Sequence, residues 1–580
     1  MPNITSRSFP QHAFEVLNQY GLPPVLARIY AARGIEQPQQ LETELSRLLP
    51  FEQLNNVTYM AALLADAISE RKHLLIVADY DSDGATACAV AIRALRELGA
   101  RVDYLVPNRF EYGYGLTPEI VQLAAMHAAG QPDILITVDN GIASVEGVQE
   151  ANQLGMQVLI TDHHLPGDRL PEAAVIVNPN QPGCNFPSKH LAGVGVIFYV
   201  MLALRAELRK RGAFLAAGKE PNLASLLDLV ALGTVADVVR LDSNNRILVQ
   251  QGLQRIRKGR ACAGINALLQ VAKRDYRQAS TYELGFIVGP RLNAAGRLDD
   301  MTMGIECLIT DDELRAHQLA AQLDELNRQR REIEADMQHD ALSKLATIIE
   351  AQKPATESCY SLCLYDPNWH QGVIGLLASR IKEKFHRPVI TFAPGNAGEI
   401  KGSGRSIPGF HLRDALDLVA KRHPGLILKF GGHAAAAGLT VHEQNLEDFR
   451  TAFERVTQML LTPADLVRVI ETDGELADDE LNLDLARCLA ECVWGQGFPE
   501  PSFNAHFYVE SQRVVAEKHL KLRLKKFDSH RSYDAILFFQ AAPLPPRIDT
   551  VFRVQVNEYN GNTTLQLLLE HWTPIGSITT

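Results

Sequence analysis

The chain has 580 residues with 57 Lys or Arg and 68 Asp or Glu, so its formal net charge is −11 at pH 7. This length corresponds to about three or four domains, and the acidic total argues against a uniformly basic nucleic-acid binder. No apolar run reaches the ~18–20 residues of a membrane span, and the N-terminus lacks the features of an export signal. We therefore expect a cytoplasmic protein with no membrane partner.

The first half of the chain alternates short Val, Ile and Leu runs with amphipathic helical segments. The runs begin at Leu74, and the first is followed by a helical pattern over residues 84–99. This alternation is typical of a parallel β-sheet covered by helices on both faces. We predict an α/β domain over residues 51–310, preceded by a helical segment over residues 1–50.

The next segment, residues 311–350, contains no Gly or Pro. Apolar residues recur in it at helical spacing: Leu319, Leu323, Leu326, Ile333 and Met337. A single helix of roughly 60 Å would connect two lobes. A helical hairpin within one lobe is the alternative.

A second α/β pattern occupies residues 351–460 and ends in two glycine-rich segments, KGSGRS at 401–406 and FGGHAAAAG at 430–438. Glycines leave backbone N–H groups open to anions. We expect phosphate contacts in both segments, and the start of an alanine-rich helix in the second. The candidate residues are Ser403, Arg405, Gly432 and His433. Ordinary turns are the alternative.

The last part of the chain changes character twice. Residues 464–492 hold nine acidic residues against two Arg, which suggests a solvated connector or face. From about Phe503, several short alternating strands follow with no helix between them. This pattern predicts a small barrel or sandwich of roughly 75 residues, within a domain over 461–580.

Acidic residues directly follow three of the predicted strands. They are Asp79, Asp81 and Asp83 after the first, Asp139 after the second, and Asp162 with His163 and His164 after the third. In open α/β sheets, ligands bind outside the carboxyl ends of the strands, so these side chains should meet at one edge. Carboxylates with imidazoles suit Mn²⁺ or Mg²⁺, and a pair of ions needs a bridging carboxylate such as Asp139. Asp237, after a later helix, is a candidate for a further ligand.

Simpler interpretations exist for each of these segments. DYDSDG matches the first half of an EF-hand loop, but the twelfth position from Asp79 is Val90 and a strand precedes it. Asp83 could instead cap the following helix, and VDNG alone would be a turn. Repetition at three strand ends favours a metal site.

Three arginines outside the glycine-rich segments are further candidates for phosphate contacts. Arg291 and Arg297 lie in GPRLNAAGRLDD, and Arg109 lies in PNRFEYGYGL. No GxxxxGK[ST] motif is present, which argues against a nucleotide triphosphatase.

Together, DYDSDG, VDNG, TDHH, ADVV and GGHAAAAG resemble the DHH phosphoesterase superfamily with its DHH-associated second domain. Other motifs, including GYGL, LAGVGV, KGSGRS and WGQGFPEP, are similar to the RecJ family of bacterial single-strand-specific 5'→3' DNA exonucleases. These motifs extend from about residue 75 to about residue 500.

The resemblance implies a two-metal core and a catalytic group. The implied metal ligands are Asp79, Asp81, Asp83, Asp139, His163 and Asp237, and the implied catalytic residues are His164, Asp139 and Asp162. Many members carry a His four residues before the second Asp, where this chain has Val77. This difference leaves open which two of the three motif aspartates bind which ion.

The resemblance also implies an oligonucleotide-binding (OB) barrel at the C-terminus. In residues 518–526, the period of two places Lys521, Arg523 and Lys525 on one face and leucines on the other. A basic face could track a DNA backbone, with Lys518 beside it and Phe507, Tyr508 or Phe527 available for stacking. A solvated edge strand is the alternative.

We therefore expect an enzyme that hydrolyses single-stranded DNA from its 5' end to 5'-mononucleotides, with two Mn²⁺ or Mg²⁺ ions, in DNA recombination and repair. A single-strand-binding protein and a helicase are candidate partners of the expected monomer. The alternatives are a phosphoesterase of short oligonucleotides, cyclic dinucleotides or pyrophosphate, and a non-catalytic DNA-binding scaffold.

Overall fold

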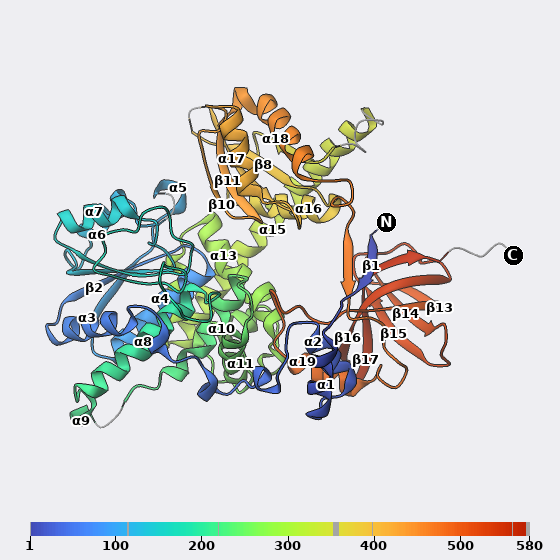
Figure 1. Ribbon diagram of the computed structural model, residues 1–580, viewed down its shortest axis with the longest axis horizontal. Helices are drawn as coiled ribbons and strands as arrows, with labels where there is room; N and C mark the ends of the chain where they lie inside the picture. Colours follow the sequence, from blue (N-terminus) through green and yellow to red (C-terminus); the bar gives the residue numbers. More distant parts are fainter. Residues whose placement is uncertain are drawn as a thin grey trace. The chain divides into compact units, whose positions relative to one another are not determined.

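The computed structural model describes residues 2–112, 115–217, 220–351, 359–396, 398–559 and 561–575, without the side chains of 109–110, 216–217, 344–351 and 559. The chain forms two compact units (Figure 1). The larger contains residues 5–324 and 471–580, and the smaller contains residues 325–470 with the extreme N-terminus. Helix α15 (Glu313–Ala351) carries the chain from one to the other, so the segment predicted as a long helix is one helix and not a hairpin.

The larger unit contains a five-stranded sheet in the order β3-β2-β4-β5-β6, and all of its neighbouring strands are parallel. The strands are β2 (His73–Ala78), β3 (Arg101–Leu105), β4 (Ile134–Val138), β5 (Gln157–Thr161) and β6 (Val175–Val177). Every residue of β2 and β4 is buried. Strands buried on both faces need apolar residues at every position, which confirms the predicted parallel sheet.

Helices cover both faces of this sheet. In Figure 1, α6 (Pro118–Ala125) and α7 (Val145–Gln153) lie on one side, with α3 (Val57–Ser69), α4 (Ser82–Glu97) and α8 (Gly193–Lys210) on the other. Helix α4 is buried on nearly every side. Its small side chains allow α8 and α10 (Leu227–Ala236) to pack closely beside it.

The larger unit contains nine further α-helices within the described residues. They are α1 (Gln11–Gln19), α2 (Pro24–Ala31), α5 (Arg109–Tyr112), α9 (Phe214–Ala217), α11 (Ser243–Arg257), α12 (Ala263–Val271), α13 (Gly289–Leu298), α14 (Thr302–Ile309) and α19 (Leu483–Glu491). The ring of Tyr30 in α2 stacks on Trp494 and Phe498, which follow α19. The WGQGFPEP motif therefore packs against the N-terminal helical segment.

The acidic stretch at 464–492 is only partly the solvated face that its charge predicts. The Asp473 side chain is fully buried, and its Oδ1 accepts a 2.6 Å hydrogen bond from Arg33 Nη1. Arg7 Nη1 lies 3.3 Å from Asp473 Oδ2. The prediction was wrong at Asp473 because its cationic partners come from the far N-terminus, which net charge per segment does not reveal.

The smaller unit contains a mixed sheet in the order β10-β11-β9-β8-β7. Its strands are β7 (Leu362–Tyr365), β8 (Val389–Pro394), β9 (Glu399–Arg405), β10 (Lys429–Gly432) and β11 (Ala436–His442). Its helices are α16 (Ile374–Phe385), α17 (Leu412–Arg422) and α18 (Leu446–Leu460). The extreme N-terminal strand β1 (Asn3–Ser6) pairs with β12 (Val469–Thr472).

The segment KGSGRS is a strand and not an open anion-binding loop. It forms most of β9, which is hydrogen-bonded to β11 on one side and β8 on the other. Gly402 and Gly404 are buried: a Cβ at Gly402 would lie 2.6 Å from Leu439 Cδ2 and Phe392 Cε1, and one at Gly404 would lie 2.7 Å from Leu412 Cδ2. The glycines are needed because a side chain at either position would clash with the core. Their backbone groups already take part in the sheet, so they are not open to an anion.

The alanine-rich helix predicted after His433 does not form. FGGHAAAAG is a β-hairpin, in which β10 pairs with β11. Gly432 has φ +138, and a Cβ there would lie 2.5 Å from the Ala436 carbonyl oxygen. The helix propensity of alanine is overridden because β11 also pairs with β9 through seven residues.

The C-terminal strands form a closed five-stranded barrel in the order β13-β14-β15-β17-β16. They are β13 (Phe503–Val515), β14 (His519–Lys526), β15 (Ser532–Leu537), β16 (Arg547–Tyr559) and β17 (Asn562–Pro574). The predicted barrel is confirmed. Within the described residues, no helix combines the length and apolar character needed to cross a membrane.

Candidate active site

The parallel ladder places three acidic residues at one edge of the sheet. The backbone N–H of Asp79 donates to Val138 O at 3.4 Å, and that of Asp139 donates to Thr161 O at 3.0 Å. Asp162 N donates in turn to Val177 O at 3.2 Å. Each acid is therefore the first residue beyond its strand, as the sequence predicts.

His163 lies among three carboxylates at this edge. Its Nε2 is 3.1 Å from Asp139 Oδ1 and 3.4 Å from Asp237 Oδ2. The Oδ2 atom of Asp83 lies 4.0 Å from the same nitrogen. Asp237 is the C-cap of α10, so a helix end reaches the strand ends.

The potential ligand atoms form three overlapping groups, each with its atoms within 4.8 Å of one another. One contains Asp79, Asp81 and Asp139, a second Asp139, His163 and His164, and a third Asp83, His163 and Asp237. Asp139 and His163 each belong to two groups. All the predicted ligands are thus brought together.

The structure separates the roles of Asp81 and Asp83. Asp81 is the N-cap of α4, and its side chain accepts from the backbone N–H groups of Asp83 and Gly84. The carboxylate of Asp83 instead accepts from Gly193 N at 2.6 Å and Val194 N at 2.9 Å. The idea that Asp83 caps the helix was wrong, because its side chain points to the start of α8.

Two glycines allow helices to approach these carboxylates. A Cβ at Gly193 would lie 2.5 Å from Asp139 Oδ1, and one at Gly233 would lie 2.8 Å from Asp83 Oδ1. Sequence reasoning noted the LAGVGV motif but did not assign Gly193 or the Val194 amide to the site. The glycine spacing was the available signal.

Backbone strain occurs at two positions of the cluster. Asp139 has φ +63, and Val238, which follows Asp237, has φ +61. Left-handed φ values are unfavourable for a β-branched residue such as Val238. Strain of this kind persists where surrounding structure holds it, and it concentrates at functional sites.

Burial and mutual repulsion make these carboxylates hard to ionise by themselves. Burial, followed by the Asp81 charge, raises the pKa of Asp83 to about 7. Burial and the neighbouring Asp83 charge also raise the pKa values of Asp139 and Asp237. Divalent cations would relieve both effects, and a carboxylate and imidazole set matches Mn²⁺ or Mg²⁺. The residues therefore fit a metal centre.

Asp162 lies directly behind His164. Its Oδ1 accepts from His164 Nδ1 at 2.8 Å, and its Oδ2 accepts from Ile142 N at 2.9 Å. Burial opposes ionisation, but the hydrogen bond and charge of His164 outweigh it and lower the pKa of Asp162. For His164, burial is outweighed by the bond and charge of Asp162, which raise its pKa to about 9.

The segment GPRLNAAGRLDD supports the first acidic turn from behind. It forms most of α13, in which Asn293 Oδ1 accepts a 2.8 Å hydrogen bond from Ser82 N. A Cβ at Gly296 would lie 1.9 Å from Tyr80 O, so only glycine fits there. Sequence reasoning missed this packing role because it treated the segment only as a source of arginines.

The three arginines that the sequence predicts to contact phosphate differ in their surroundings. Arg291 is buried, and its guanidinium bonds Asp324 at 2.7 Å and Ile287 O at 2.6 Å. Arg297 is half-buried near the end of α13. The Arg109 side chain lies outside the described residues. Arg291 is therefore committed to structural contacts, which weakens its assignment to phosphate.

In the smaller unit, Ser403 and Arg405 lie against the first turn of α16. A Cβ at Gly375 would lie 2.9 Å from both Arg405 Nη2 and Ser403 Oγ. Arg405 Nη1 also donates to Ser403 Oγ at 3.2 Å. A helix N-terminus beside a guanidinium attracts anions. The exposed His433 lies at the tip of the β10–β11 hairpin.

The basic stripe predicted on β14 is present. Leu520, Leu522 and Leu524 are buried in the barrel. The alternate residues are at least partly exposed: His519, Lys521, Arg523 and Lys525. Lys518 is exposed in the turn before the strand.

Aromatic rings flank this stripe. The rings of Tyr508 and Phe527 stack with centroids 4.2 Å apart, and the Arg547 guanidinium lies 5.6 Å from the Tyr508 ring. Phe507 is fully buried and is not available for stacking, because the period of two turns it into the barrel.

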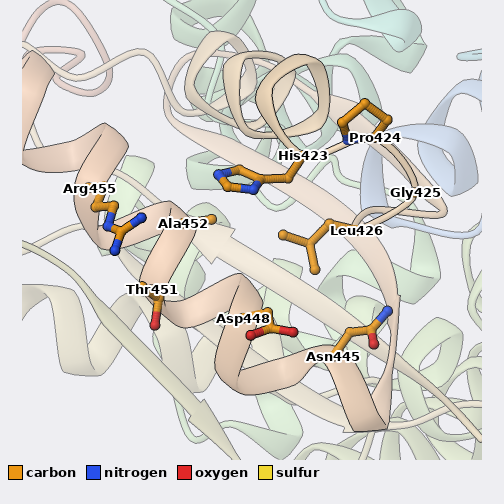
Figure 2. Close-up of a pocket in the computed structure, with 9 residues that line it drawn as sticks. All are labelled: His423, Pro424, Gly425, Leu426, Asn445, Asp448, Thr451, Ala452 and Arg455. Carbon is orange, nitrogen blue, oxygen red and sulfur yellow. The ribbon is translucent and has the colours of Figure 1, made fainter.

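A separate surface hollow of about 550 Å³ lies in the smaller unit, between the end of α17 and helix α18 (Figure 2). Its polar lining includes His423, Asn445, Asp448 and Arg455. None of the predicted site residues lines it. The hollow is thus distinct from the cluster of carboxylates.

Three family models match the chain. Residues 73–234 match the N-terminal domain of the DHH family, residues 357–459 match the DHHA1 domain, and residues 472–571 match the RecJ OB domain. The metal-site residues Asp79 to His164 lie in the first match, and the basic stripe of β14 lies in the third.

Known proteins are similar along nearly the whole chain. The single-stranded-DNA-specific exonucleases RecJ of Dickeya dadantii and Escherichia coli are 51% and 49% identical to it, each over 96% of both chains. A crystal structure of RecJ from Thermus thermophilus in complex with Mn²⁺ is 29% identical with a TM-score of 0.81, and covers 99% of this chain and 80% of its own. A Mg²⁺ complex from that organism has a TM-score of 0.75, with 28% identity, and covers 99% and 78%. The chain therefore belongs to the RecJ family of single-stranded-DNA-specific exonucleases.

Proposed function

We propose that this protein digests single-stranded DNA from its 5' end and releases 5'-mononucleotides by metal-dependent phosphodiester hydrolysis, in DNA recombination and repair. The observation that carries the proposal is the convergence of Asp79, Asp81, Asp83, Asp139, His163 and Asp237 at one sheet edge. Polarity and product follow the resemblance to the RecJ family.

Two divalent ions are proposed to bind in the overlapping groups of ligands. Asp139 is the bridging candidate because it belongs to two groups, one with Asp79 and Asp81 and one with His163. Asp237, close to His163, would complete the second position. When bound, the ions supply the positive charge that neutralises the phosphate and promotes deprotonation of the attacking water. Mn²⁺ and Mg²⁺ are the candidates, since the similar Thermus structures contain them.

His164 is proposed to contact the reacting phosphate as a cation. The raised pKa, about 9, keeps its imidazole protonated at neutral pH. Because Nδ1 is bonded to Asp162, contact with the phosphate would come from Nε2. Asp162 then acts as a positioning residue for His164, rather than as the directly catalytic group that the sequence suggested.

Contacts to the rest of the strand are proposed in both units. Ser403 and Arg405 of β9, which lie against the first turn of α16, would bind phosphate with Gly432 and His433 of the hairpin. Arg109 and Arg297 remain predicted phosphate contacts. Lys518, Lys521, Arg523 and Lys525 would follow the DNA backbone on the barrel.

The division of the chain into segments 1–50, 51–310, 311–350, 351–460 and 461–580 is proposed as its domain organisation. The three family matches lie within the second, fourth and fifth segments. We further propose a cytoplasmic monomer that works with a single-strand-binding protein and a helicase, as the family resemblance implies.

Product analysis on end-labelled strands tests the function. The wild-type protein with Mn²⁺ should release labelled mononucleotide at once from 5'-labelled single strands, whereas a 3' label should stay in shortening fragments. Asp139→Asn should abolish release. Asp228→Asn is the matched control, because Asp228 is also buried but lies at the start of α10, opposite the end that Asp237 caps, and accepts from the Cys262 amide. Mn²⁺-dependent release by a clean Asp139→Asn preparation would refute the metal assignment.

A phosphoesterase of small substrates is the competing function. The basic stripe of the barrel favours a long strand, since a cyclic dinucleotide or pyrophosphate needs no extended groove. Equal turnover of dinucleotides and long single strands, with no effect of neutralising Lys521 and Lys525, would favour the competitor.

A further inference from the structure

Two aromatic side chains are exposed side by side just before α13. Tyr282 is 53% exposed and Phe286 is 66% exposed. Their rings stack with centroids 5.3 Å apart and planes 26° from parallel. An exposed aromatic pair leaves a large apolar area in water, which favours a partner that covers it.

The local backbone holds the pair outward. Ser280 begins the helical segment, and its backbone N–H and hydroxyl both donate to Glu283 Oε2, at 3.0 and 2.7 Å. The segment Glu283–Val288 is a π-helix that buries Leu284, Ile287 and Val288. Since these residues already fill the inner face, the two rings are not needed for the core. Short π-helical segments are rare and occur often at functional sites.

The π-helix that carries the pair packs against segments that hold metal-site residues. A Cβ at Gly285, beside Phe286, would lie 3.2 Å from Val235 Cγ1, two residues before Asp237. One at Gly289 would lie 3.2 Å from Ala236 Cβ, and the Gly289 carbonyl accepts a 2.9 Å hydrogen bond from Ser82. The π-helix is therefore packed directly on the segments that carry Asp237 and the first acidic turn.

We propose that Tyr282 and Phe286 form a platform on which a nucleobase of the DNA strand stacks while the strand occupies the metal site. This inference rests on the proposed exonuclease function. Base stacking suits the pair because every base has an apolar face, so the contact would be independent of sequence. A duplex, whose bases already stack on each other, would gain nothing from the platform.

Binding without turnover tests the proposal. Single strands with 2-aminopurine near the 5' end and linkages that resist hydrolysis are titrated with the Mg²⁺-loaded protein, and fluorescence quenching reports stacking of that base. The Tyr282→Leu/Phe286→Leu double variant keeps apolar volume but removes both rings. We expect the position-specific quenching to disappear and the Kd to rise at least about fivefold, the lower end for one stacked base. Strands that are abasic over the same positions should bind both proteins equally.

Controls separate stacking from folding and from catalysis. Tyr59→Leu removes a 56% exposed ring from α3 and should change neither quenching nor Kd. Phe286→Trp should retain quenching, which shows that a ring at this position suffices. The double variant should still cleave at saturating DNA, with raised KM and a kcat close to wild type. Unchanged quenching, or an equal loss of affinity for abasic strands, would overturn the platform while leaving the exonuclease function standing. If the wild-type protein did not cleave single strands at all, the proposed exonuclease function itself would be refuted.

Discussion

Asp162 Oδ1 lies 2.8 Å from Nδ1 of His164, and the same oxygen accepts the backbone N–H of His163 and of His164. One buried carboxylate thus fixes both the position and the charge of a single imidazole. His163, the neighbouring residue, faces Asp139 and Asp237 instead. The two adjacent histidines therefore have different nearest carboxylates, although both lie close to Asp139.

Asp162→Asn should shift the pH dependence of catalysis. Asp162 raises the pKa of His164 to about 9, so losing its charge lowers that pKa. If protonated His164 is the active form, kcat of the variant should begin to fall at a lower pH than in the wild type. We also expect kcat at neutral pH to drop at least about tenfold. Asp133→Asn is the matched control, since Asp133 bonds His73 N at the opposite end of the sheet. A variant profile that keeps the wild-type alkaline limb would contradict this account.

Mn²⁺ should stabilise the protein against heat, and more so at higher pH. Binding only to the folded state contributes about 2.7 kcal/mol at a concentration 100 times Kd. Without metal, the raised pKa of Asp83, about 7, means that the folded state holds protons that the unfolded state releases. The metal-free protein therefore loses stability as pH rises from about 4 to about 7. Added Mn²⁺ replaces those protons, so the Tm increase should grow over the same range. Differential scanning fluorimetry measures it.

The matching control for this measurement is Asp139→Asn, which should show a much smaller Mn²⁺-induced increase in Tm. The same increase in the variant and the wild type would place the metal elsewhere. Addition of EDTA to the wild-type protein should return the Tm to the metal-free value.

Neutralising the barrel stripe should weaken DNA binding through electrostatics alone. Lys521→Ala/Lys525→Ala removes two contacts to phosphate, so the slope of log K against log salt should become shallower by about 1.4. Fluorescence anisotropy with single strands at several salt concentrations provides the slope. Lys72→Ala/Lys210→Ala should leave the slope unchanged, because Lys72 precedes β2 and pairs with Glu70, and Lys210 at the end of α8 pairs with Glu207. An unaltered slope in the Lys521/Lys525 variant would remove β14 from the DNA path.

Asp473→Ala should destabilise the larger unit strongly. Arg33 and Asp473 have side chains that are 1% and 0% exposed, and removing one member leaves the other charge buried without its partner. The expected loss is about 3–5 kcal/mol, measured by urea denaturation. The exposed pair of Arg211 and Asp66 supplies the comparison, because Asp66→Ala should change stability by less than about 1 kcal/mol. Similar losses from both substitutions would mean that burial of the Arg33 pair is immaterial.

The sequence predicted the architecture and the position of the site well, because both depend on local periodicity and on one rule about strand ends. Asp79, Asp139 and Asp162 each stand one residue beyond a run of apolar residues, and any parallel sheet brings such residues to the same edge. The long helix α15 was predicted from helical spacing without Gly or Pro, with a hairpin as the alternative, and the alternation of β14 was predicted from its period of two.

The errors concern residues whose partners are distant in sequence. Asp83 was a plausible helix cap until the amides of Gly193 and Val194, over a hundred residues away, proved to hold it. Arg291 looked available for phosphate because Asp324 is not adjacent to it in sequence. The glycine- and alanine-rich segments were also predicted wrongly, as an anion-binding loop and a helix. Their composition does not show that both segments pair with other strands of the sheet. The exposed pair of Tyr282 and Phe286 carried no signal, because aromatic residues at helical spacing are usually core.

The packing of β9 has a consequence for how its sequence can change. The side chains of Phe392, Leu439 and Leu412 fill the space that a Cβ at Gly402 or Gly404 would occupy. A larger residue at either glycine therefore requires a smaller one opposite, so Gly402→Ala should be accepted together with Phe392→Leu more readily than alone. The polar residues of the same strand, Ser403 and Arg405, pack instead against the first turn of α16, where Gly375 leaves them room. The two sets of positions would therefore change with different neighbours, the glycines with the core side chains and the polar residues with α16.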